Sequence, residues 1–248
     1  MKAVILAAGY ATRLYPLTLE RPKHLLEVAG RPLLERLLEQ LPLGELETVY
    51  VVTNAKFAPR FREWAEQQAV AQGVEVIDDG TATEEEKLGA IGDLELVIRT
   101  RGIRDDLLVA AGDSLFTERL DGFVEFARGR DAAAVGVYDV GELEAVKRLS
   151  SIGVDDDSRV ISSEEKPERP TSTLAGIALY YYPRSVLSLV SQYLRDGNNP
   201  DQPGRLVEWL YTRKPVYAWR VPGEWLDIGT PDALADADRL FGSCADAG

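Results

Sequence analysis

Residues 1–36 read MKAVILAAGYATRLYPLTLERPKHLLEVAGRPLLER. The apolar run at 2–7 predicts a buried strand, and the small residues that follow, including Gly9, predict a tight turn before a helix. The segment carries six basic side chains against three acidic ones, a local charge of +3 in a protein whose formal net charge is −13. A basic turn after a strand is typical of a polyphosphate-binding site.

Apolar runs of the same kind recur along the first half of the chain. We expect further strands at 48–53, 74–78 and 107–111, and helices at 32–41, 57–72, 84–99 and 117–128. The strand-like runs are continuous rather than alternating, as in parallel strands that are covered on both faces. The pattern predicts an α/β fold with a doubly wound, mostly parallel, Rossmann-like mixed sheet.

The second half predicts fewer helices and a smaller mixed β region. We expect strands near 132–138, 159–164, 174–182, 215–220 and 225–228, and helices near 184–195, 204–213 and 231–241. The run Asp155-Asp156-Asp157-Ser158 is typical of a hairpin turn. No stretch has the composition of a linker, so we expect a single domain over 1–248. In it, about 1–130 hold the phosphate turn and about 131–248 cover the open edge of the sheet.

Composition argues against several classes of binding partner and of cellular location. A pI near 4.7 argues against binding to nucleic acid or to an anionic membrane, which needs a broad basic face. No apolar run approaches the roughly 20 residues that span a bilayer. The single cysteine, Cys244, cannot form an internal disulfide, and the N-terminus does not resemble an export signal. These features predict a cytoplasmic protein.

The turn after the first strand has the residue types that phosphate binding requires. Ala8 and Gly9 let the backbone approach a ligand closely, and Thr12 lies in the same turn. Arg13 offers a forked donor to phosphate oxygens and Lys23 a point charge. We therefore expect these five residues to bind the phosphates. A Walker A loop is excluded, because no G-K-[ST] follows.

The longer pattern is more specific. Residues 6–34 follow LAAGxxTRLxPLTxxxPKxLLxVxGxPLL, and Gly112-Asp113, Glu165-Lys166-Pro167 and Trp225-Leu226-Asp227-Ile228-Gly229-Thr230 come later. In these motifs and in their order the chain resembles the sugar-1-phosphate nucleotidyltransferase family. That family includes glucose-1-phosphate thymidylyltransferases and mannose-1-phosphate guanylyltransferases. The resemblance implies a Mg²⁺-dependent enzyme that joins a nucleoside triphosphate to a sugar 1-phosphate and releases pyrophosphate.

The resemblance also implies roles for individual residues. Asp113 and Asp227 would bind Mg²⁺, a hard cation that prefers oxygen ligands. Glu165 would bind sugar hydroxyls and Lys166 the sugar phosphate, so the second half becomes the sugar-phosphate-binding half. Arg13, Lys23 and Lys166 would be the catalytic residues.

The implied chemistry asks little of acid–base side chains. The nucleophile is a phosphate oxygen, and a phosphate monoester with a second pKa of about 6 is mostly dianionic at pH 7. Catalysis would consist of positioning and charge neutralisation during in-line attack on the α-phosphorus. The single histidine, His24, need not be a general base.

Two segments are expected to select the base. Thr81-Ala82-Thr83 occupies the place of a Gln-rich loop in the thymidylyltransferases, and Leu88-Gly89-Ala90-Ile91-Gly92 resembles the LGTAGAL run of the guanylyltransferases. We expect Thr81 and Gly89 to bind the nucleotide. The sequence leaves the identity of the base open.

Three departures from the family pattern matter. Ala11 replaces the second glycine of the usual GxGTR turn, which predicts an ordinary negative φ there. His24 follows Pro-Lys in place of Pro or Gln, and we expect a loop histidine with a neighbouring hydrogen-bond partner. Ser150 replaces a glycine whose backbone contacts the sugar, and we expect it in the acceptor pocket. The acceptor therefore stays open between a hexose 1-phosphate and a cyclitol or non-sugar phosphate.

The sequence is also compatible, in part, with three other functions. A cytidylyltransferase acting on a non-sugar or cyclitol phosphate is the alternative within the same chemistry. A glycosyltransferase could use Asp155-Asp156-Asp157 for a metal, but it would leave Arg13 and Lys23 without a role. A non-catalytic nucleotide-binding regulatory subunit would require the loss of a metal or phosphate ligand, and all expected positions are filled. Assembly into a homo-oligomer stays open.

Overall fold

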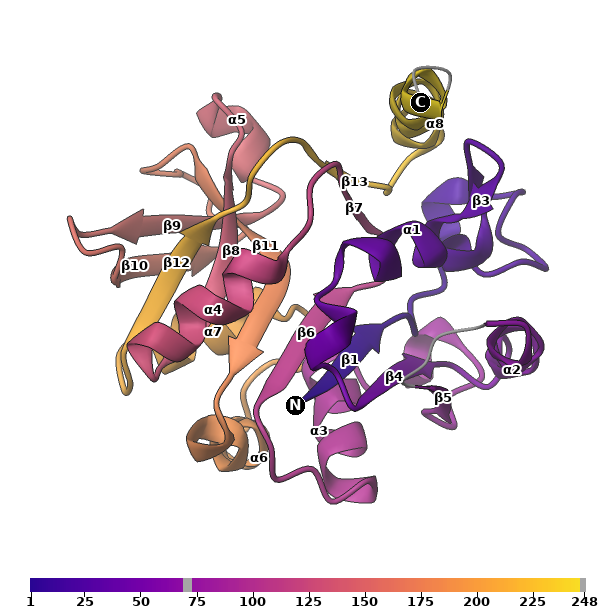
Figure 1. The fold of residues 1–248 in the computed structure, drawn as a ribbon. Helices are drawn as coiled ribbons and strands as arrows, with labels where there is room; N and C mark the ends of the chain where they lie inside the picture. The colour runs from indigo at the N-terminus through magenta and orange to yellow at the C-terminus, as the bar shows by residue number, and fades with distance from the viewer. Residues whose placement is uncertain (69–72, 246–248) are drawn as a thin grey trace.

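The computed structural model describes residues 1–68 and 73–245, and a nine-stranded mixed sheet forms its centre (Figure 1). Its first half is parallel, as the continuous apolar runs predict. The parallel strands, in order across the sheet, are β6 (Leu107–Ala111), β1 (Lys2–Leu6), β4 (Thr48–Thr53) and β5 (Val74–Asp78). Because these strands point the same way, the loops that follow them meet at one edge.

The second half of the chain extends the same sheet beyond β6. The long strand β11 (Leu174–Tyr182) pairs antiparallel with β6 and joins the two halves. The remaining strands on this side are β8 (Ala133–Asp139), β9 (Ser150–Val154), β10 (Val160–Glu165) and β12 (Val216–Arg220). Only β8 and β12 pair in parallel among them. The expected smaller mixed β region is therefore present.

Helices cover both faces of the sheet. The α-helices are α1 (Leu33–Gln40), α2 (Ala58–Glu66), α3 (Ala90–Thr100), α4 (Asp121–Arg130), α5 (Leu143–Val146), α6 (Leu187–Arg195), α7 (Gly204–Leu210) and α8 (Pro231–Ala245). Short 3₁₀ helices span Thr12–Leu14, Lys23–Leu25, Leu43–Glu45, Glu84–Glu86 and Arg184–Val186. No helix within the described residues is both long and apolar enough to cross a bilayer.

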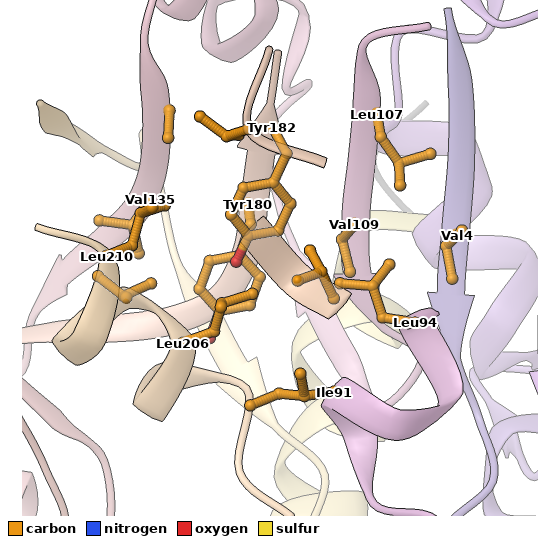
Figure 2. Packing of buried hydrophobic residues seen from close by; sticks show 14 of the residues in the cluster. Val4, Ile91, Leu94, Leu107, Val109, Val135, Tyr180, Tyr182, Leu206 and Leu210 are labelled. Carbon is orange, nitrogen blue, oxygen red and sulfur yellow. The ribbon is translucent and has the colours of Figure 1, made fainter. Parts of the chain in front are cut away.

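Side chains of β1 alternate between two buried cores. Ala3 and Ile5 pack with residues of α1, α2 and α4 on one face, and Val4 packs with residues of α3, α6 and α7 on the other. The second core crosses from the first half into the second, and Tyr180 and Tyr182 of β11 stack within it at a ring-centroid distance of 5.9 Å (Figure 2). Burial of both faces explains why the strand sequences are apolar without alternation.

The C-terminal end of the chain returns to the N-terminal segment. β13 (Trp225–Asp227) pairs antiparallel with β7 (Ser114–Phe116), and α8 then packs near the hairpin of β2 (Glu27–Val28) and β3 (Arg31–Pro32) (Figure 1). This return brings residues from both ends of the sequence to the same edge of the sheet.

The sequence-based boundaries were wrong at several places. The expected helix at 84–99 begins only at Ala90, and the expected helix at 117–128 runs from Asp121 to Arg130. The last part of the expected helix at 57–72 lies outside the described residues, and β9 was not expected at all. The hairpin turn is confirmed: the amide of Ser158 donates to the Asp155 carbonyl at 3.0 Å between β9 and β10.

Candidate active site

A cavity of about 470 Å³ opens at the carboxyl edge of the parallel strands. It is lined by eleven of the twelve residues that the sequence singled out, namely Ala8, Gly9, Thr12, Arg13, Lys23, Gly89, Asp113, Ser150, Glu165, Lys166 and Asp227. These residues are spread over more than 200 positions of the chain. The fold therefore gathers the motifs from both halves in one place.

The turn after β1 is held in shape by buried side chains from elsewhere. Asn54, which follows β4, donates from Nδ2 to the Ala8 carbonyl at 2.8 Å. Thr18 donates from Oγ1 to the Ala11 carbonyl at 2.8 Å. Both side chains are fully buried. The backbone of the turn is thus fixed before any ligand binds. Neither supporting residue was predicted from the sequence.

The prediction for Ala11 was wrong. Its φ is +51°, in the left-handed region, instead of the expected negative value. The chain must reverse there, because Ala11 directly precedes the 3₁₀ helix Thr12–Leu14 and its carbonyl accepts the amide of Leu14 at 3.0 Å. The geometry that glycine usually supplies is kept although the residue is alanine.

Asp113 and Asp227 lie side by side because β7 pairs with β13. Asp113 directly precedes β7, Asp227 is opposite Ser114, and the amide of Ile228 donates to the Asp113 carbonyl at 3.0 Å. Burial and the neighbouring charge of Asp113 raise the pKa of Asp227. Two carboxylates this close favour a shared cation.

Two basic side chains lie beside these carboxylates. Lys23 donates from Nζ to Asp113 Oδ2. Burial would raise the pKa of Asp113, but the Lys23 ammonium outweighs it and the pKa lies below its ordinary value. A Cβ atom on Gly229 would lie 3.3 Å from Asp227 Oδ2 and 3.4 Å from Arg13 Nη2, so Gly229 leaves room for both groups.

The two aspartates could hold a divalent cation. Within residues 1–68 and 73–245 no group of three or more histidine, cysteine or acidic side chains forms a metal-binding cluster. A cation that binds through one or two carboxylates and keeps most of its waters, as Mg²⁺ does, fits a pair of this kind.

His24 does not have the partner that we expected. Its Nδ1 is buried and accepts or donates no hydrogen bond within the protein, while the ring lies against Phe61 at a centroid distance of 5.9 Å. A Cβ atom on Gly112 would lie 2.8 Å from His24 Cδ2. Burial, together with the Lys23 charge, lowers the pKa of His24 to about 3. A group with so low a pKa is a weak base, and packing explains its place.

The acceptor side of the cavity is built from the ends of two paired strands. Ser150 begins β9 and is opposite Glu165, the last residue of β10. Ser150 Oγ donates to Glu165 Oε2. Burial raises the pKa of Glu165 although the Ser150 hydroxyl favours its charged form. The departure from the family glycine therefore places a hydroxyl directly on the expected sugar-binding carboxylate.

Lys166 follows β10 in an unusual backbone conformation. Its φ is +51°, and its amide donates to the Leu149 carbonyl at 2.8 Å. Its exposed side chain lines the cavity, as does that of Arg148. Two cationic groups are thus available at the acceptor end of the cavity.

The segment at 198–205 also reaches the site and was missed. Its Pro200 carbonyl accepts the Ile91 amide at 2.9 Å, and its Asp201 carbonyl accepts the Ala90 amide at 3.2 Å. Gly89, at φ +79°, packs against this backbone so closely that a Cβ atom would lie 2.6 Å from the Pro200 oxygen. The segment therefore caps the N-terminus of α3, although the two are about 110 residues apart in the sequence. Its turn residues (NNPDQPG) predict a loop but not this contact.

Thr81 is the one predicted site residue that does not line the cavity. Its hydroxyl donates to Asp79 Oδ1 at 2.8 Å, and its carbonyl accepts the hydroxyl of Tyr10 at 3.3 Å. Asp93, in the first turn of α3, lines the cavity instead and was not identified from the sequence. The side chain of Thr81 thus faces another protein group.

Known proteins resemble this chain over almost its full length. The bifunctional protein GlmU of Methanocaldococcus jannaschii is 26% identical over 245 residues, which are 97% of this chain and 54% of that protein. A putative mannose-1-phosphate guanyltransferase of Sulfolobus acidocaldarius is 27% identical over 231 residues, 93% of this chain and 60% of that protein. The chain thus spans somewhat over half the length of these curated relatives.

Solved structures share the fold. A putative glucose-1-phosphate thymidylyltransferase from Bacillus anthracis, in complex with a sucrose, superposes with a TM-score of 0.79 at 24% identity, covering 98% of this chain and 95% of that one. A UDP-glucose pyrophosphorylase complexed with UDP-glucose gives a TM-score of 0.82 at 19% identity, covering 98% of each chain. A nucleotidyl transferase family model matches residues 2–242. Because that match spans nearly the entire chain, the protein belongs to the nucleotidyl transferase family.

Proposed function

We propose that the protein joins a nucleoside triphosphate to a sugar 1-phosphate, giving a nucleoside diphosphate sugar and pyrophosphate. The observation that carries this proposal is the shared cavity. The phosphate turn with Arg13 lines one side, Glu165 and Lys166 line the other, and the aspartate pair lies with them. A two-substrate displacement needs both phosphates in one enclosure.

Arg13 and Lys23 are proposed to bind the triphosphate and to stabilise the leaving pyrophosphate. Their charges complement the negative charge that moves to the leaving group during in-line attack. Lys166 is proposed to hold the acceptor phosphate against the α-phosphorus. The acceptor is already mostly dianionic at pH 7, so the low pKa of His24 is no obstacle to the reaction.

Asp113 and Asp227 are proposed to hold Mg²⁺. Mg²⁺ held there would supply positive charge against the reacting phosphates. Lys23 already donates to Asp113, so this lysine is positioned to balance the carboxylates in the absence of the cation. The raised pKa of Asp227 supports the need for further positive charge.

A second acceptor class is favoured by one observation. The Ser150 hydroxyl donates to Glu165, at the position where the family pattern has a glycine. Glu165 then has fewer free lone pairs for the hydroxyls of a hexose. This observation favours an acceptor with fewer hydroxyl groups, so a non-sugar phosphate with a cytidine nucleotide as donor is the alternative substrate pair, while a cyclitol phosphate, which is as rich in hydroxyl groups as a hexose, stays open.

The test is a matrix of substrates. ATP, CTP, GTP, UTP and dTTP are each combined with hexose 1-phosphates, cyclitol phosphates and choline phosphate in the presence of Mg²⁺, and pyrophosphate release is measured. We expect release with at least one sugar 1-phosphate. A regulatory subunit would bind a triphosphate without releasing pyrophosphate, and a glycosyltransferase would consume only nucleotide sugars. Either result would overturn the proposal.

A further inference from the structure

Two neighbouring carboxyl groups, one buried (Asp93) and one half-buried (Asp79), lie at one end of the cavity. Asp79 directly follows β5, and Asp93 is in the first turn of α3. The charge of Asp79 acts on Asp93 at close range, and Asp93 lines the cavity although the residue is only 4% exposed. No lysine or arginine in the described part of the chain forms an ion pair with either carboxyl group. Neither residue has a role in the proposed reaction.

The hydrogen bonds of the pair show where its proton lies. Burial raises the pKa of Asp79, but its Oδ1 accepts the amide and the hydroxyl of Thr81 at 2.7 and 2.8 Å, and these hydrogen bonds favour its charged form. Burial and the charge of Asp79 raise the pKa of Asp93 to about 8. A proton on Asp93 at neutral pH would be available to Asp79, so that the pair carries one negative charge instead of two.

One oxygen of Asp93 is left as an acceptor. Asp79 Oδ2 and Asp93 Oδ1 are both sealed from solvent and have no hydrogen-bond partner, so a proton shared between these two atoms would satisfy both. No described residue donates a hydrogen bond to Asp93. The other carboxyl oxygen, Oδ2, is then a carbonyl-like acceptor in a residue that lines the cavity.

The position of Asp79 and Asp93 in the cavity indicates which part of the nucleotide lies next to them. In the proposed reaction the α-phosphate lies near Asp113 and Asp227, with the acceptor on the side of β9 and β10. The base then extends to the opposite side of β1, towards β5, where the acid pair lies. Tyr10 and Gly89 line the same end of the cavity.

We propose that Asp93 is a base-specificity residue, whose free carboxyl oxygen accepts a hydrogen bond from an N–H group on the pairing edge of the nucleotide base. The inference rests on the proposed function, because it takes the ligand to be a nucleoside triphosphate. A base that presents a carbonyl or a ring nitrogen lone pair at this position is rejected, since two acceptors would face each other.

The test compares nucleotides with a ligand that lacks the base. Binding of ATP, CTP, GTP, UTP, dTTP and inorganic tripolyphosphate, each with Mg²⁺, is measured by titration calorimetry for the native protein, Asp93→Asn and Asp93→Ala. Tripolyphosphate carries the phosphate charges without a base. The native protein should bind at least one nucleotide more tightly than tripolyphosphate.

The two variants should differ in how tightly they bind the preferred nucleotide. Asp93→Ala should weaken binding of the preferred nucleotide about tenfold and leave tripolyphosphate unchanged, because only the base contact is lost. Asp93→Asn should keep the preference, since its amide N–H replaces the shared proton and its oxygen remains the acceptor. Should Asp93→Ala not fold, Asp93→Leu removes the acceptor while keeping a similar shape.

Three results would overturn the inference. One is equal weakening of nucleotide and tripolyphosphate, which would indicate a structural role. Another is no change for either ligand in Asp93→Ala. The third is a native protein that binds no nucleotide more tightly than tripolyphosphate. Pyrophosphate release is assayed separately, so a protein that binds nucleotides through Asp93 but releases none would contradict the proposed function alone.

Discussion

The two sides of the cavity are built in different ways. On the nucleotide side, a continuous turn after β1 supplies the backbone, and Asn54 and Thr18 hold it by its carbonyl groups. On the acceptor side, Ser150 and Glu165 meet across paired strands, and Gly204 closes against both side chains. The first side is one continuous segment fixed by supporting side chains, and the second is assembled where two strands and a helix meet. A change at the middle of the site should disable both, whereas a change at one side should leave the other working.

Asp113→Asn tests the middle and should have the largest effect. It removes one of the two carboxylates proposed to hold Mg²⁺, so kcat should fall by at least about 10³-fold. The fold should survive, because asparagine has the same shape. The measurement is pyrophosphate release together with a thermal unfolding curve.

Asp156→Asn, an exposed position in the hairpin turn, is the matched control and should keep native activity. A kcat within tenfold of the native value for Asp113→Asn, with Mg²⁺ as the only metal present, would contradict the metal assignment.

Gly204→Ala should disable the acceptor side alone. Its new methyl group would clash with Ser150 Oγ and Glu165 Oε2, and the backbone of α7 cannot move far, since neighbouring Leu206 is in the core. We expect kcat/KM for the acceptor phosphate to fall about 100-fold, about 3 kcal/mol, with triphosphate affinity unchanged.

Gly129→Ala is the control for this change, because nothing lies within 4 Å of its Cβ position. If triphosphate affinity fell as much as the acceptor kcat/KM in Gly204→Ala, the two sides would not be separable and the comparison would fail.

The same contrast explains what could be predicted from the sequence. The residues of the phosphate turn are close together in the chain, so a motif identifies them, and the parallel strands are apolar enough to be recognised. Strand β9 was missed because Ser150 and Ser151 are polar residues buried only by pairing with β10 and β11. The expected helix at 84–99 began too early because its true start depends on carbonyl groups of Pro200 and Asp201.

Individual site residues divide in the same way. Sequence motifs identify the charged residues Arg13, Lys166, Asp113 and Asp227, and all four line the cavity. Asp93 has no such motif: its significance comes from burial next to Asp79, which only the fold determines. The error at Ala11 arose because the residue type was used to predict φ, although the hydrogen bond from Thr18 and the helix that follows select the turn.

Asp93→Asn should sharpen the description of the nucleotide side through its pH dependence. The folded protein holds Asp93 protonated up to about pH 8, whereas in the unfolded chain this group ionises near 3.8. Between these values the folded state binds more protons, so the native free energy of unfolding decreases as pH rises. The decrease is about 1.4 kcal/mol per pH unit, or about 3 kcal/mol from pH 5 to pH 7.

Asp93→Asn removes this titration, so its urea unfolding should lose less stability over the same range. Asp156→Asn should follow the native curve. Parallel curves for native protein and Asp93→Asn would show that Asp93 ionises normally in the folded state and that the pair shares no proton.

Ala11→Gly should have the smallest effect. Alanine at φ +51° costs about 1 kcal/mol relative to glycine, but glycine gives the unfolded chain more freedom, which offsets part of the gain. We expect a net stabilisation of less than about 1 kcal/mol, measured by urea unfolding. Ala65→Gly, in α2, is the contrast: there the same exchange should destabilise by about 1 kcal/mol. If Ala11→Gly destabilised as much as Ala65→Gly, the turn would not be strained. The nucleotide side would then owe its shape to the residue itself rather than to Asn54 and Thr18.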